Sequence, residues 1–114
     1  MQVMLSGGMA SDPANLLRQK GAPGEAAALL RILANETRLM VLCRLGRDER
    51  TVSDLQEALD LQQPTLSQHL AVLREADIVA TRRSGQKIFY HIENPAVLDI
   101  IATLGCIFCP EDKP

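Results

Sequence analysis

Aromatic side chains are nearly missing from this 114-residue chain, which has no tryptophan, one tyrosine and two phenylalanines. Proteins that hold single-stranded nucleic acid stack its bases on aromatic rings, so this composition argues against that mode of binding. The chain also lacks an apolar run of about 18 residues, which argues against a membrane-spanning helix. Its first ten residues lack the basic start and long apolar stretch of a secretory signal, so we expect a cytoplasmic protein.

Histidine and cysteine are also scarce, and their spacing limits the chemistry that we expect. The two histidines, His69 and His91, are not clustered in the way that zinc ligands are. The three cysteines are an odd number, and a cytosolic protein seldom keeps structural disulfides. We therefore expect no bound metal and no cofactor, and the cysteines need another explanation.

Net charge is −2 at neutral pH, so the chain is not a generally basic nucleic-acid binder. Residues 61–91 nevertheless hold four basic and two acidic residues, a local balance of +2. Residues 1–60 have a balance of −1, from seven bases against eight acids, and residues 92–114 have −3, from one against four. Positive charge that gathers in one segment of an acidic chain indicates where a DNA backbone would bind.

The segment 61–76 is predicted to be a helix with a polar start. Pro64 suits the first turn, where its missing N–H costs nothing. Leu66, Leu70 and Leu73 recur at helical spacing and predict the side that faces the core. The remaining side chains of the start can form hydrogen bonds with base edges in a major groove: Gln63, Thr65, Ser67, Gln68 and His69. An amphipathic surface helix fits the same pattern, and the next segment favours DNA binding.

Two β-prone runs, residues 78–83 and 86–92, flank Ser84 and Gly85 and predict a hairpin. Gly85 suits the turn because it accepts a positive φ without strain. The hairpin tip is polar and basic, and its side chains are suited to holding phosphate: Arg82, Arg83, Gln86 and Lys87. A solvated surface hairpin would look similar, but a basic hairpin directly after a helix-turn-helix is typical of a winged helix.

Capping and breaking residues predict further helices over residues 13–20, 23–35, 36–45, 52–59 and 95–108. We therefore expect a mainly α protein with a small β-hairpin, an α+β fold with a winged helix-turn-helix over residues 23–109. Residues 1–22 are expected to form a flexible tail with a short helix, and residues 110–114 a C-terminal tail. The apolar stripes of residues 26–33 and 97–107 exceed what so small a domain can cover, which predicts an α-helical dimer interface.

A family resemblance is carried by the segment QPTLSQHLAVLREADIVATRRSGQKIFYHI. It resembles the recognition helix and wing of the ArsR/SmtB family of bacterial winged-helix repressors, and the resemblance extends over residues 25–110. It implies a homodimer that binds double-stranded operator DNA, an imperfect palindrome, and leaves it when an inducer binds. It places the base-reading positions and the wing as follows: Gln63, Thr65, Ser67 and Gln68 at bases, and Arg82, Arg83, Gln86 and Lys87 in the wing.

Members of this family sense different inducers, and the residues here narrow the choice. Arsenic-sensing members carry cysteines at positions that are here Thr51, Ser53 and Gln56, and zinc-sensing members use histidines that the last helix lacks. The run IIATLGCIFCP, together with Cys43, is similar to the BigR, SqrR, YgaV and HlyU type, which responds to sulfide-derived persulfides or oxidants. The resemblance implies a redox switch between Cys43 and Cys109, with reactive sulfur species or an oxidant as inducer.

Two alternatives for the cysteines stay open. Cys43, Cys106 and Cys109 together are also a suitable ligand set for a soft metal or metalloid, sensed by the same DNA-binding repressor. The Cys106-x-x-Cys109 pair is found in thiol–disulfide oxidoreductases too, but no βαβ pattern surrounds it here. We therefore do not expect an enzyme. Cys43 alone, beside Val41 and Leu42, also fits a small buried hydrophobic residue.

Overall fold

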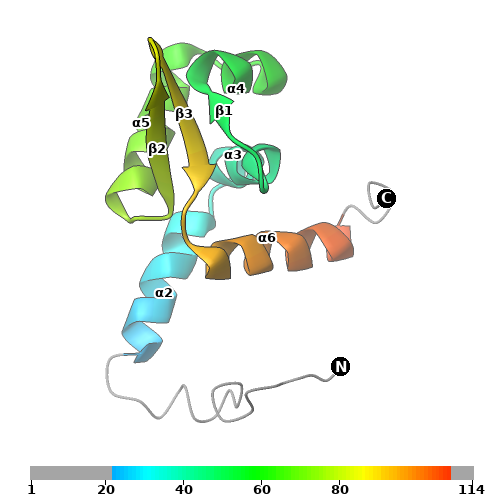
Figure 1. Ribbon diagram of the computed structural model, residues 1–114. Coiled ribbons are helices and arrows are strands. Elements are labelled where there is room, and N and C mark those ends of the chain that lie inside the picture. Colours follow the sequence, from blue (N-terminus) through cyan, green and yellow to red (C-terminus); the bar gives the residue numbers. More distant parts are fainter. Residues whose placement is uncertain (1–21, 109–114) are drawn as a thin grey trace. The chain divides into compact units, whose positions relative to one another are not determined.

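The computed structural model describes residues 22–108 (Figure 1). In chain order the elements are α2 (Ala22–Leu33), α3 (Glu36–Leu45), β1 (Arg50–Thr51), α4 (Val52–Leu59), α5 (Gln63–Glu75), β2 (Val79–Ser84), β3 (Lys87–Ile92) and α6 (Pro95–Phe108). Five helices and one antiparallel sheet in this part of the chain confirm the mainly α fold with a small β component. No helix among these residues has the length and apolar character that a membrane crossing requires.

Several sequence predictions lie outside the described residues. They include the helix expected over residues 13–20, the tail expected at 110–114 and the position of Cys109. The tail expected over residues 1–22 is described only at Ala22, which begins α2. Backbone contacts group the chain into two units, residues 1–33 and residues 34–114. In the first unit, α2 ends at Leu33, two residues before the predicted end.

Side-chain caps determine where three helices begin. The Asn35 side chain accepts a hydrogen bond from the backbone N–H of Arg38 at 3.0 Å, which starts α3. Thr51 and Asp54 form a reciprocal capping box at the start of α4, with bonds of 3.1 and 3.2 Å. Asn94 accepts from the N–H of Ala96 at 2.9 Å, next to the start of α6. Because these caps are local signals, the predicted bounds of 36–45, 52–59 and 95–108 are confirmed.

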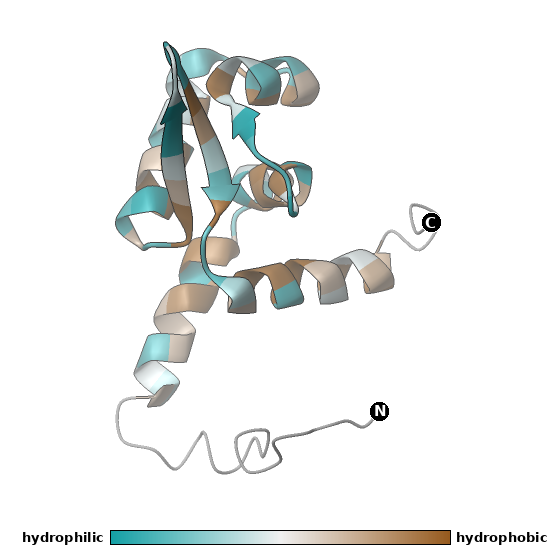
Figure 2. Ribbon diagram, in the orientation of Figure 1, coloured by the Kyte–Doolittle hydropathy of each residue, from teal (hydrophilic) through white to brown (hydrophobic). Residues whose placement is uncertain are grey.

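The core of the second unit is aliphatic, and it positions α5. Helix α3 packs against α4, α5 and α6, and α5 packs against β2. The three helices of the helix-turn-helix region contribute side chains that are at most 1% exposed: Val41, Leu42, Leu45, Leu55, Leu66, Leu70 and Leu73. Figure 2 shows the contrast between the hydrophilic hairpin tip and α6, which is hydrophobic along most of its length.

The sheet has the order β1-β3-β2, and both pairings are antiparallel. Ser84 pairs with Lys87, so Gly85 and Gln86 form the two-residue loop, one position later than the predicted Ser84-Gly85 turn. Gly85 has a φ of 65°, which confirms the need for glycine there. Strand β1 was not predicted, because two residues without periodicity give no strand signal. Together β2 and β3 form the predicted wing.

Candidate functional site

The start of α5 presents its polar side chains to solvent. Helix α5 begins at Gln63, two residues later than predicted, and its first turn holds no acidic residue. Leu66 and Leu70 are buried against the core, and this orients the rest of the helix. The predicted base-reading side chains that are exposed are Gln63, Thr65, Ser67 and Gln68. An exposed, uncharged hydrogen-bonding face on a helix matches what a DNA major groove admits.

His69 has a partner inside the protein. It is partly buried, and its Nδ1 lies 3.3 Å from Nη1 of Arg38 on α3. A guanidinium only donates hydrogen bonds, so Nδ1 is the acceptor in this contact. The contact connects the recognition helix to the helix that carries Cys43. Base reading by His69 stays a prediction. The contact with Arg38 is a second function that the ring can have.

The wing tip carries exposed polar and basic side chains. Arg83, Gln86 and Lys87 are all exposed, and they flank the Gly85 turn. Residues 86–88 and residues 51–54 line a groove of about 390 Å³ between the wing and the start of α4. The tip of the hairpin therefore lies beside the first helix of the helix-turn-helix, on the same unit as the exposed face of α5.

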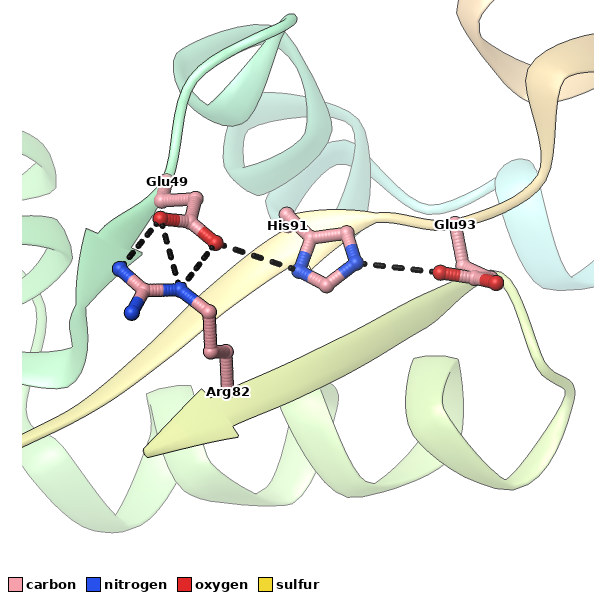
Figure 3. Close-up of polar contacts among 4 residues, drawn as sticks. All are labelled: Glu49, Arg82, His91 and Glu93. Atoms are coloured by element: carbon pink, nitrogen blue, oxygen red, sulfur yellow. Dashed lines mark hydrogen bonds and ion pairs between the residues drawn. The ribbon is translucent and has the colours of Figure 1, made fainter. Parts of the chain in front are cut away.

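Arg82, also predicted to grip phosphate, is held by a carboxylate (Figure 3). Its Nε donates to both oxygens of Glu49, at 3.1 and 2.9 Å, and its Nη2 donates to Oε1 at 2.7 Å. The guanidinium carbon lies 5.1 Å from the centroid of the Phe89 ring, a cation–π contact. Arg82 thus has a fork-shaped ion pair on its edge and an aromatic ring against its face.

His91 extends the same cluster. Its Nε2 lies 3.1 Å from Oε1 of Glu93, and its Nδ1 lies 3.8 Å from Oε2 of Glu49 (Figure 3). Glu49 therefore faces Arg82 from one side and the imidazole from the other. We call these four residues, Glu49, Arg82, His91 and Glu93, the wing cluster.

Contacts within the wing cluster shift the pKa values of Glu49 and Arg82. The hydrogen bond from Arg82 lowers the pKa of Glu49, burial opposes this shift, and the charges of Arg82 and His91 add to the lowering. The same hydrogen bond and charge raise the pKa of Arg82. In the capping box, hydrogen bonds from the backbone and side chain of Thr51 lower the pKa of Asp54. Glu49 and Arg82 are both charged at neutral pH.

Cys43 lies on the exposed side of α3, so its interpretation as a buried hydrophobic residue is wrong. It borders a groove of about 690 Å³ that also includes Leu39, Met40 and Leu59. Cys106 is exposed on α6. Within residues 22–108 no group of three or more His, Cys, Asp or Glu side chains is arranged to hold a metal ion. The pairing of Cys43 with Cys109, and any three-thiol site, stay predictions because Cys109 lies beyond Phe108.

Four residues of this site were not predicted from the sequence: Arg38, Glu49, His91 and Glu93. Glu49 precedes Arg50, which pairs with Tyr90 in the sheet, and this pairing brings Glu49 next to His91. Without the pairing of β1, nothing in the sequence relates Glu49 to a hairpin 33 positions further along. Arg38 follows the Asn35 cap, but its contact with His69 spans 31 positions and has no local signature.

Comparison with known proteins gives a consistent result. Residues 35–81 match the family described as bacterial regulatory protein, arsR family. The chain is 48% identical over 90 residues to the biofilm growth-associated repressor of Agrobacterium fabrum, which covers 78% of this chain and 77% of the relative. It is 39% identical over 101 residues to the transcriptional activator HlyU of Vibrio cholerae, covering 89% and 94%. The solved structure of reduced HlyU from that species has a TM-score of 0.74 at 40% identity, covering 76% and 92%.

Proposed function

The chain belongs to the arsR family of bacterial regulatory proteins, and from this premise we propose that it is a homodimeric repressor released from its operator by thiol modification. It is a DNA-binding transcriptional regulator with a winged helix. One observation carries the proposal of how it binds DNA. The uncharged polar face of α5 is exposed on the same unit as a basic wing tip.

In the proposed complex, a two-fold dimer presents two α5 helices about 34 Å apart to successive major grooves of an imperfect palindrome. The start of α5 reads base edges, because amide and hydroxyl groups donate and accept there without repelling phosphate. The wing lies beside the backbone. The proposed contacts are Gln63, Thr65, Ser67, Gln68 and His69 on α5, and Arg83, Gln86 and Lys87 in the wing. Arg82, the fourth predicted wing residue, is held by Glu49.

Exposed apolar side chains support the proposed dimer. On α6, Ile107 and Phe108 are 60% and 75% exposed, and on α2, Leu30 is 56% exposed. Val97 and Ile101 of α6 were predicted to belong to the interface, but they are 0% and 8% exposed and pack in the core of the protomer. The proposed interface therefore uses the C-terminal half of α6 and a face of α2.

The dimer is tested by Phe108→Asp. A charge at an apolar interface is costly, so we expect a folded monomer with reduced operator affinity in analytical ultracentrifugation and binding assays. Ile101→Asp is the contrasting variant, because it places a charge in the core and is expected to unfold the protomer. A Phe108→Asp protein that remains fully dimeric would show that α6 does not supply the interface.

The proposed switch uses Cys43 and Cys109. Cys43 is exposed on α3, which packs against α4, α5 and α6. A persulfide donor converts one cysteine to a hydropersulfide; the thiolate of the other attacks its inner sulfur, forms a disulfide and expels hydrosulfide. The bridge would join α3 to the segment after α6, and α3 also contacts α5 through Arg38 and His69. The name of one solved relative, reduced HlyU, distinguishes a redox state of that protein, and this supports a redox-sensitive site in the present chain.

Operator binding with and without persulfide tests the switch. We expect the wild-type protein to lose about 5- to 150-fold in affinity on treatment. Cys43→Ser and Cys109→Ser should bind DNA in both conditions, whereas Cys106→Ser, the matched control, should still respond. Intact-mass measurement separates a direct disulfide from a bridge with added sulfur atoms. A Cys109→Ser protein that persulfide still releases would refute the pairing, and dependence on all three cysteines with bound metal would support a soft-metal or metalloid sensor instead.

A further inference from the structure

Arg82 differs from the other two cations of the wing. The sheet order β1-β3-β2 places β3 between Glu49, which precedes β1, and Arg82 in β2. Their ion pair therefore spans the central strand and connects the two outer parts of the sheet (Figure 3). The ion pairs seen within residues 22–108 include neither Arg83 nor Lys87. Those two side chains are exposed at the tip.

The ion pair commits one edge of the Arg82 guanidinium to Glu49, although the side chain is 51% exposed. That edge, formed by Nε and Nη2, is one of the two on which a guanidinium binds a carboxylate or phosphate in a fork. One face of the group lies against the Phe89 ring. A DNA phosphate would have to displace Glu49 to form the same fork, and it would leave the carboxylate beside DNA without its main partner.

The ion pair of Arg82 with Glu49 also adds a connection between the hairpin and the segment before α4, where the backbone pairing is short. Strand β1 pairs with β3 through only two positions, Arg50 with Tyr90 and Thr51 with Phe89. Apolar packing holds the base of the hairpin, where Val79 and Ile92 are buried, but few backbone hydrogen bonds connect the hairpin to the strand before α4. The ion pair with Glu49 joins the loop before β1 to the outer strand β2, and this is a second connection that holds the hairpin in position relative to that loop.

We propose that Arg82 is a positioning residue: its ion pair with Glu49 sets the angle of the wing, while Arg83 and Lys87 contact phosphate. This proposal rests on the proposed DNA-binding function. Glu49 thereby becomes part of the DNA-binding apparatus without touching DNA, although an acidic residue near a DNA interface would ordinarily oppose binding. The proposed role requires the planar fork by which two nitrogens of the guanidinium bind one carboxylate. A lysine at position 82 has no such fork and cannot replace the arginine.

The salt dependence of binding separates positioning from phosphate contact, because each lost phosphate contact reduces the slope of log affinity against log salt concentration by about one unit. Arg82→Ala and Arg82→Lys should both weaken operator binding by about two- to fivefold, the range for an exposed ion pair, and leave the slope unchanged. Arg83→Ala and Lys87→Ala should each reduce the slope by about one unit. Circular dichroism confirms that each variant is folded.

Glu49→Gln and Asp48→Asn provide a matched pair. Each removes one negative charge from the same loop, but Asp48 bonds Arg50 and does not contact Arg82. Glu49→Gln should bind the operator more weakly than Asp48→Asn, and the double variant Glu49→Gln/Arg82→Ala should bind no more weakly than Arg82→Ala alone.

The opposite pattern would overturn the proposal. In that pattern Arg82→Ala reduces the slope by about one unit, Arg82→Lys restores it, and Glu49→Gln strengthens binding at least as much as Asp48→Asn does. That result would refute the positioning role and leave the proposed docking of the wing intact. If neither Arg83→Ala nor Lys87→Ala changes the slope, the wing does not dock on the DNA backbone, and both proposals fail.

Discussion

The recognition helix and the wing are held in place by different kinds of interaction. Helix α5 is anchored by Leu66, Leu70 and Leu73, which are at most 1% exposed. The outer half of the wing depends on hairpin pairing and on a charged cluster in contact with solvent. Apolar burial changes little with salt or pH, whereas exposed ion pairs respond to both. The element that we propose to read bases is therefore anchored by apolar burial, and the element that we propose to hold phosphate is the one whose support responds to salt and pH.

The largest effect should follow from weakening the anchor of α5. Leu70→Ala removes a side chain that is 1% exposed and should lower the free energy of unfolding by about 2–5 kcal/mol in urea denaturation. Ile88→Ala is the control in the wing, where the side chain is 42% exposed and the loss should stay near 0.5 kcal/mol. Equal losses for the two variants would contradict the difference between the two regions.

A smaller effect should distinguish what the two regions do on DNA. Gln68→Ala should reduce discrimination at one base pair by about 1–3 kcal/mol and leave the salt dependence unchanged. Lys87→Ala should weaken binding to all sequences alike and reduce the salt slope. Competition binding with single-base operator variants at several salt concentrations measures both quantities. Loss of base preference in the Lys87 variant would mean that the wing also reads sequence.

The smallest effect concerns pH. The pKa of Glu49 is lowered in the folded protein, so its ion pair stabilises the fold above the carboxyl's unfolded pKa, and this contribution disappears as pH falls through the lowered value. Urea unfolding should therefore show a difference between wild type and Glu49→Gln at about pH 7 that disappears as pH falls through the lowered pKa of Glu49. Asp54 shifts in the same direction, so Glu49→Gln keeps that part of the acid dependence. If the difference in unfolding free energy between wild type and Glu49→Gln does not change with pH, the ion pair does not contribute to stability in this way.

Local chemistry made most of the fold predictable. Asn94, Thr51 and the leucines of α5 act within one or two helical turns, and they placed the helices and the core face from the sequence alone. The alternative of a buried Cys43 was wrong because a helix turns by about 100° per residue, so a residue next to buried Val41 and Leu42 can face solvent.

What the sequence could not predict is contact between distant positions. The ion pair of Glu49 with Arg82 spans 33 positions and requires a strand of two residues to be in register. Composition identified Arg82 as a cation of the wing and said nothing about the carboxylate that holds it. Long-range polar pairs of this kind have no periodic pattern, so only the folded arrangement shows them.

Strand β2 lies at the end of the sheet, with β3 as its one neighbouring strand in the described part of the chain. An edge strand offers unpaired backbone groups to which another chain can add. Arg82 is paired with Glu49, but Arg83 of this strand is exposed and belongs to none of the ion pairs seen within residues 22–108. A second copy of the strand added at this edge would bring two such cations together, and like charges oppose edge-to-edge pairing.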